Sequence, residues 1–75
     1  MELEGSELQD LADEALAAMP DNAERRAFML HDFEGYSHKE IANMLDISEI
    51  AAKMKAFRGR KRFRETFYHI ARDYR

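Results

Sequence analysis

Apolar residues recur along the chain at the spacings of three and four that are typical of amphipathic helices, in four blocks separated by turn residues. The first block predicts a helix from Ser6 to Met19, with Ser6 as its N-cap. Pro20 ends this helix, because proline cannot continue it without a clash. The segment before Ser6 is acidic and ends in a glycine, so residues 1–5 are predicted to form a flexible tail.

The second block predicts a helix that begins after Asp21 and ends near Gly35. Asp21 is the expected N-cap, and Glu24 follows it by three residues, which is the spacing of a capping box. The helix continues through Ala27, Phe28, Leu30, His31 and Phe33 up to Gly35. Gly35 can adopt the left-handed conformation that often ends a helix, so we expect a positive φ there.

Two serine caps lie eleven residues apart and predict a helix, a tight turn and a second helix. Ser37 opens a helix of about two turns, with Glu40 at the capping-box position. Asp46 and Ile47 form the turn, and Ser48 caps the next helix. That last helix contains no proline and is predicted to run to about Tyr74.

The long last helix has two distinct faces when its residues are placed about 100 degrees apart. Its buried stripe is predicted to consist of Ala52, Ala56, Gly59, Phe63, Phe67, Ile70 and Tyr74. The first half of this stripe is small, so the preceding helices are expected to cross it closely between Ala52 and Gly59. The opposite side carries Ile50, Met54 and Phe57, called the apolar trio below, between Lys and Arg side chains. Apolar side chains on an exposed helix face indicate a contact surface.

Charge separates this helix from the rest of the chain. Residues 1–49 hold thirteen Asp or Glu and three Lys or Arg, whereas residues 50–75 hold nine basic and two acidic side chains, within a net charge of -3. A basic helix in an acidic chain favours a nucleic-acid partner. The alternative is a solvated amphipathic face, which is the commonest role of a charge run. The tight turn and its two caps favour DNA.

Several classes of function find no support in the sequence. Seventy-five residues form at most one domain, predicted over residues 6–75, and its core is small. Ser37 and Ser48 serve as caps, and no base accompanies either serine, so we expect no enzyme. The chain has no cysteine, and His31, His38 and His69 lack the spacing of paired metal ligands. We therefore expect no metal, cofactor or small-molecule substrate.

Two further expectations concern location and packing. The sequence contains no apolar run long enough to cross a bilayer and begins with acidic residues, so we expect a cytoplasmic protein without membrane contact. Met19, Met29 and Met44 are predicted to fill gaps in the core. The acidic first helix could dock on a basic partner, or fold back beside the basic helix and compete with DNA.

Short motifs follow one another between residues 18 and 64: Ala18-Met19-Pro20, Arg25-Arg26-Ala27-Phe28, Asp32-Phe33-Glu34-Gly35-Tyr36-Ser37, Glu40-Ile41-Ala42, Leu45-Asp46-Ile47-Ser48, Lys53 and Arg58-Gly59-Arg60. In this order they resemble region four of bacterial extracytoplasmic-function sigma factors. The run Phe-Glu-Gly-Tyr-Ser followed by Glu-Ile-Ala distinguishes this resemblance from other helix-turn-helix proteins, such as LuxR-type regulators.

This resemblance implies an all-α, four-helix domain that contains a helix-turn-helix and a long C-terminal recognition helix. It implies binding to double-stranded promoter DNA at the upstream, minus thirty-five element and contact with the flap of RNA polymerase. An anti-sigma factor that covers the same surfaces is implied as well. The side chains expected at DNA are Tyr36, Lys39, Ser48, Lys53, Met54, Lys55, Phe57, Arg58, Arg60 and Arg62.

Three positions depart from the family pattern. Ala51 and Met54 stand where the family commonly has hydroxyl groups, and Lys55 replaces an arginine. These departures and the apolar trio support a second hypothesis, a sigma-mimicking protein-interaction module that binds an anti-sigma factor or RNA polymerase with little DNA binding. The resemblance covers region four and not the promoter-melting region, so we do not expect these 75 residues alone to act as a complete sigma factor.

Overall fold

The computed structural model describes residues 4–73 as four helices, and this part of the chain contains no strand. The helices are α1 (Gly5–Ala18), α2 (Ala23–Asp32), α3 (His38–Leu45) and α4 (Glu49–Arg72). They form an elongated body of 42 × 19 × 16 Å. The predicted all-α, four-helix class, with a helix-turn-helix and a long C-terminal helix, is confirmed.

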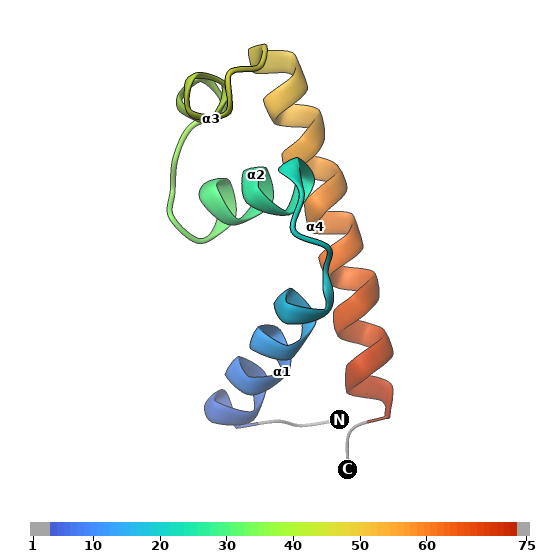
Figure 1. The fold of residues 1–75 in the computed structure, drawn as a ribbon. Coiled ribbons are helices and arrows are strands. Elements are labelled where there is room, and N and C mark those ends of the chain that lie inside the picture. Colours follow the sequence, from blue (N-terminus) through green and yellow to red (C-terminus); the bar gives the residue numbers. More distant parts are fainter. Residues whose placement is uncertain (1–3, 74–75) are drawn as a thin grey trace.

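Helix α4 is the axis of the molecule, and the three shorter helices all lie along one side of it (Figure 1). Helix α3 lies beside the N-terminal half of α4, α2 crosses near the middle and α1 lies beside the C-terminal half. Among the described helices, α1 contacts α4 alone, whereas α2 and α3 also contact each other. The acidic helix α1 is therefore distant from the N-terminal half of α4, so it does not fold back over that half.

The core around the helix-turn-helix is built from small side chains. Its buried members are Ala27, Ile41, Ala42, Ala52 and Ala56, and the partly buried Leu30, Leu45 and Ile47 pack against them. Small residues allow helix axes to approach closely. On α4 the predicted stripe is buried at Ala52, Ala56 and Gly59 and half-buried at Phe63, Phe67 and Ile70. Tyr74 lies outside the described residues.

Gly59 marks a close crossing of two helices. A Cβ atom added there would lie 2.6 Å from the Cβ of Phe28 and closer still to the backbone carbonyl oxygen of Glu24. Both neighbours belong to α2, so α2 passes directly over Gly59. The expected close crossing between Ala52 and Gly59 is confirmed.

Local hydrogen bonds fix the helix-turn-helix as predicted. The Ser37 hydroxyl accepts from the Glu40 amide at 3.1 Å, and the Glu40 carboxylate accepts from the Ser37 amide at 2.9 Å. This second bond lowers the pKa of Glu40. The Ser48 hydroxyl accepts from the Ala51 amide at 3.0 Å and so caps α4. Between the two helices, Asp46 takes the left-handed conformation with φ 57°.

Gly35 also behaves as predicted, with φ 78°, but two predicted caps are wrong by one or two residues. Helix α1 begins at Gly5 with Glu4 as its N-cap, not Ser6, because the Glu4 amide donates to the Glu7 carboxylate at 3.4 Å. The predicted tail therefore overlaps the helix at Gly5, and residues 1–3 lie outside the described part.

Asn22, not Asp21, caps α2. The Asn22 side chain accepts from the Arg25 amide at 3.0 Å, whereas the Asp21 carboxylate contacts Arg26 at 3.3 Å. Asp and Asn cap helices about equally well, so the sequence pattern left this shift of one residue open.

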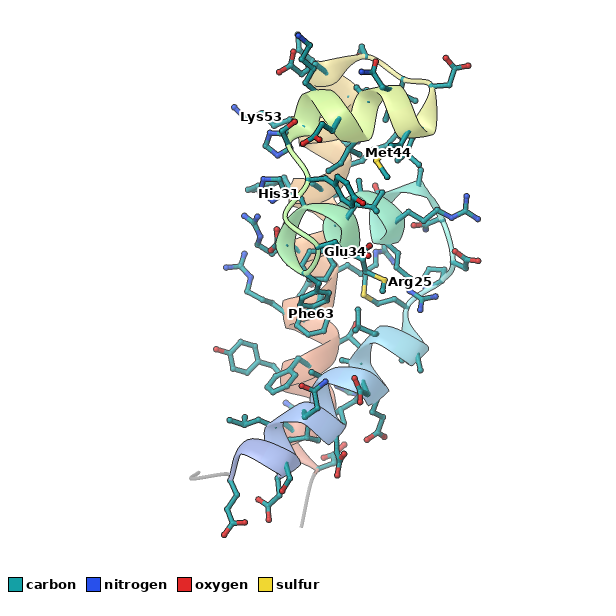
Figure 2. All side chains as sticks on the ribbon, turned by 90° about the vertical axis from the view of Figure 1, so that its left-hand side faces the viewer. Arg25, His31, Glu34, Met44, Lys53 and Phe63 are labelled. Carbon is teal, nitrogen blue, oxygen red and sulfur yellow. The ribbon has the colours of Figure 1, made fainter. Side chains whose placement is uncertain are left out.

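Met44 is the one predicted core methionine that the structure places at the surface, where it is 50% exposed (Figure 2). The buried face of the short helix α3 is occupied by Ile41 and Ala42, so a residue two positions further points outward. Met19 is buried and Met29 is half-buried, in accordance with the prediction. None of the helices in residues 4–73 offers an apolar stretch long enough to cross a bilayer.

Candidate nucleic-acid interface

The outward face of α4 is open in its N-terminal half, because α2 and α3 cover only the opposite side. On this face the apolar trio is exposed as predicted: Ile50 is 77%, Met54 42% and Phe57 55% exposed. Basic side chains surround the trio at Lys53, Lys55, Arg58, Lys61, Arg62 and Arg64, of which only Lys55 is half-buried. The surface therefore combines cations with apolar groups along one helix.

Most of the basic residues fall on two edges of α4, with the apolar trio and Lys61 between them. At about 100 degrees per residue, Lys53 and Arg60 lie on one edge, and Arg58 and Arg62 lie on the other. Arg58, Lys61 and Arg62 line a polar hollow of about 370 Å³ together with Glu24, Glu65 and Thr66. The sequence-predicted contacts thus form two cationic borders rather than one continuous patch.

Three of the residues predicted to contact DNA lie at the start of α3 and α4. Tyr36 is exposed just before α3, and Lys39 is exposed in the first turn of that helix. The Ser48 hydroxyl is exposed at the N-cap of α4, where it already accepts one amide hydrogen bond. Unpaired amides at a helix start attract anions, so these positions suit phosphate groups.

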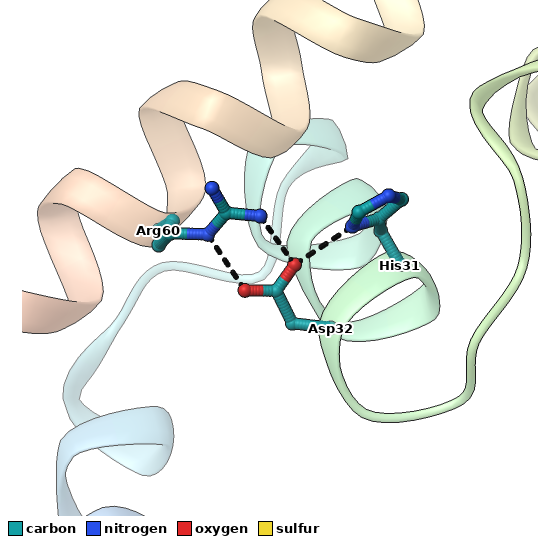
Figure 3. A network of polar contacts seen from close by, with 3 residues as sticks. All are labelled: His31, Asp32 and Arg60. Carbon is teal, nitrogen blue, oxygen red and sulfur yellow. Dashed lines mark hydrogen bonds and ion pairs between the residues drawn. The ribbon is translucent and has the colours of Figure 1, made fainter.

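Arg60 is the one predicted DNA contact that another side chain of the described residues already engages in a forked contact (Figure 3). Its Nε donates to Asp32 Oδ2 and its Nη2 donates to Asp32 Oδ1, each at 2.7 Å. This pair lowers the pKa of Asp32 and raises that of Arg60. Asp32 lies at the end of α2, so the pair ties α2 to α4 and turns Arg60 toward α2.

Two histidines stack beside this pair. The rings of His31 and His38 lie 4.3 Å apart, centroid to centroid, with 7° between their planes. His31 Nδ1 is also 2.8 Å from Asp32 Oδ1. Burial lowers the pKa of His38, and electrostatic repulsion from the neighbouring His31, Lys53 and Arg60 side chains lowers it further, while Glu49 opposes this shift. Lys53 and His31 appear on the same edge of the molecule in Figure 2.

Neither the Asp32–Arg60 pair nor the histidine stack was predicted from the sequence. Asp32 and Arg60 are 28 residues apart, and the histidines are separated by the turn between α2 and α3. The one signal in the sequence for the histidine stack is the expected turn at Gly35, which reverses the chain between the two histidines. Within residues 4–73, no group of three or more His, Asp or Glu side chains is arranged to hold a metal ion.

An apolar groove lies at the other end of the molecule, between α1 and the C-terminal half of α4. It has a volume of about 470 Å³, and we call it the aromatic groove; its lining comprises Gly5, Leu8, Gln9, Ala12, Phe33, Phe63, Arg64, Phe67 and Tyr68. Leu8, Phe33 and Tyr68 are exposed there. Leu8 and Phe33 continue the helical spacing of apolar residues in α1 and α2, and both lie at the surface of this groove.

Packed aromatic rings form the floor of the aromatic groove. The Phe28 ring lies 5.2 Å from those of Phe33 and Phe63, and the Phe67 ring lies 6.0 Å from that of Phe63. Phe63 is visible below α2 in Figure 2. Aromatic pairs at these distances contribute about 0.5–1.5 kcal/mol each beyond their burial. The groove is therefore a preformed apolar surface on a stable base.

A short helix packed across the inner side of a long helix, with a tight turn between them and a basic outer face, defines a helix-turn-helix DNA-binding domain. The chain belongs to the sigma-70 region 4 family, because the family model described as Sigma-70, region 4 matches residues 9–63. Comparisons with curated proteins and with solved structures gave no match. At the level of the family, the match indicates binding to promoter DNA and contact with RNA polymerase. The match does not distinguish subgroups of this family, so the extracytoplasmic-function type rests on the resemblance of the sequence motifs alone.

Proposed function

We propose that the N-terminal half of α4 enters the major groove of double-stranded promoter DNA at the minus thirty-five element. The observation that carries this proposal is the exposed face of α4, where the apolar trio stands between two cationic edges while the opposite side is buried. In helix-turn-helix proteins the second helix reads the groove with its N-terminal residues. The match to the sigma-70 region 4 family supports the same target.

Each predicted contact has a role in this proposal. Lys53 and Arg58 reach base edges or phosphates, and Met54 and Phe57 contact bases. The contacts assigned to the DNA backbone are Tyr36, Lys39, Ser48, Lys55, Arg60 and Arg62. Arg60 can act there only when a phosphate replaces its forked contact with Asp32.

The salt dependence of binding tests this proposal. A protein that neutralises several phosphates loses affinity steeply between about 50 and 200 mM salt. Lys53→Ala and Arg58→Ala should each weaken duplex binding and reduce the logarithmic salt slope by about one if the residue contacts a phosphate. Arg72→Ala is the matched control, because Arg72 is exposed on the same helix about 28 Å beyond Lys53. Binding that ignores salt, or that weakens equally in all three variants, would refute the proposed surface.

For the polymerase contact we propose the aromatic groove. It is apolar and open, and it lies at the end of α4 opposite to the DNA surface, so both partners can bind together. The occupant is the polymerase flap, which presents apolar side chains to Leu8 and Tyr68. Tyr68→Asp should abolish capture of an isolated flap domain and leave duplex binding intact. Capture that survives in this variant would place the contact elsewhere.

A second candidate function rests on the apolar trio itself. Ile50, Met54 and Phe57 form a more apolar surface than one that presents hydroxyl groups to DNA. In this candidate function they hold an anti-sigma factor or RNA polymerase, with little DNA binding. Met54→Asp combined with Phe57→Asp should then abolish capture of the protein partner. If capture survives while duplex binding is lost, the DNA-binding proposal is favoured and this candidate fails.

A further inference from the structure

The apolar trio extends along α4 over a distance that corresponds to a few base pairs of DNA. Ile50 and Phe57 are seven residues apart, which corresponds to about 10 Å along a helix that rises about 1.5 Å per residue. Base pairs are spaced about 3.4 Å apart along the DNA axis, so this row spans about three base-pair steps. Met54 and Phe57 are three positions apart and therefore neighbours on the same face of the helix.

The chemistry of the apolar trio restricts what it can recognise. Ile and Phe carry no hydrogen-bonding group, and the Met thioether is only a weak acceptor. Amino and carbonyl groups on base edges lose their water when such side chains cover them, and a buried unpaired polar group costs free energy. The thymine C5-methyl is the one apolar group that the four base pairs present in the major groove. Covering this methyl group is favourable for the same reason that burying any apolar surface is.

We infer that Met54 and Phe57 select DNA sites by contacting the C5-methyl groups of thymines at neighbouring base pairs. This inference rests on the proposed function, since it requires α4 to lie in the major groove. Lys53 and Arg58 on the two borders supply attraction to phosphates, and the apolar trio supplies sequence preference. Ala51 and Met54 carry no hydroxyl group, so neither side chain donates a hydrogen bond to the polar edge of a base.

Replacing thymine with uracil tests the inference, because the two bases differ only in the C5-methyl group. The full 75-residue chain is used to select a tight-binding duplex from a random-sequence pool, and each thymine of that duplex is then replaced singly with uracil. One or two positions should lose about fourfold in affinity, which is the worth of one buried methyl group. Fluorescence anisotropy of a labelled duplex measures the change.

Protein variants identify the side chain that is responsible for the loss of affinity when uracil replaces thymine. Met54→Ala should remove the uracil penalty at one position and Phe57→Ala at another, because the contact that uracil deletes is already gone. Both side chains are exposed, so the fold should be unaffected, as circular dichroism would verify. Lys53→Ala is the matched control, and it should weaken thymine and uracil duplexes by the same factor.

The outcomes separate this inference from the proposed function. Uracil duplexes that bind as tightly as the thymine parent, or a penalty that persists in both alanine variants, would overturn the inference alone. A wild-type chain that binds no duplex from the pool would overturn the proposed function and the inference with it.

Discussion

Gly59→Ala tests the packing that presents α4 to DNA. In an open helix this exchange stabilises the protein by about 1 kcal/mol, because glycine is a poor helix former. In this protein the new Cβ would lie 2.6 Å from the Cβ of Phe28 and nearer to the carbonyl oxygen of Glu24. Neither atom is the end of a flexible side chain, so α2 itself must move. Overpacking of this kind costs about 1–3 kcal/mol.

The expected balance is a net loss of up to about 2 kcal/mol, because the close approach places this site near the upper end of the overpacking range. A domain of this size has a total stability of roughly 4–11 kcal/mol, so the loss is a large part of it. The melting temperature should fall by roughly 8–16 °C for a loss of about 2 kcal/mol. Thermal and urea unfolding, followed by circular dichroism, measure both quantities.

Gly5→Ala is the matched control for this experiment. Gly5 also lies in a helix, but a Cβ added there would have no atom of the described residues within 4 Å. This variant should be as stable as the wild type or slightly more stable, by up to about 1 kcal/mol. If Gly59→Ala proves equally harmless, α2 does not cross α4 as closely as described, and the packing argument is wrong.

Three further predictions concern other contacts of the fold. Asp32→Asn should lower stability by no more than about 1 kcal/mol but raise duplex affinity, because Arg60 becomes free for phosphate; an unchanged or lower affinity would contradict this. Because folding lowers the pKa of His38, its imidazole ring binds a proton more readily in the unfolded chain than in the folded one. Stability should therefore fall as pH drops below about 6.5, and His38→Gln should flatten this slope in thermal unfolding between about pH 8 and 5. Leu11→Ala, at a side chain 1% exposed, should cost about 2–5 kcal/mol in urea unfolding, and a near-neutral result would show that α1 is not docked.

The sequence predicted the features that depend on neighbours along the chain. The Ser37 and Glu40 capping box and the Ser48 cap need only a spacing of three residues, and each forms as expected. Likewise, the helical period alone predicts that Ala52 and Ala56 point inward while the apolar trio points outward.

Features that depend on tertiary contacts could not be predicted in this way. Asp32 meets Arg60 across 28 residues, so only the crossing of α2 over α4 brings them together. The aromatic groove forms because α1 lies beside the C-terminal half of α4, which leaves Leu8 exposed although it belongs to a helical stripe. Asn22 replaces Asp21 as a cap because the two residues are nearly equivalent in that role.

The most direct test of the central claim is an amide NMR titration of the chain with a promoter-length duplex. If the N-terminal half of α4 enters the major groove, the largest shifts should occur at Lys53, Met54 and Phe57, while Leu8 and Phe67 in the aromatic groove stay unchanged. Shifts confined to Leu8 and Phe67, or the absence of any shift at low salt, would contradict the account.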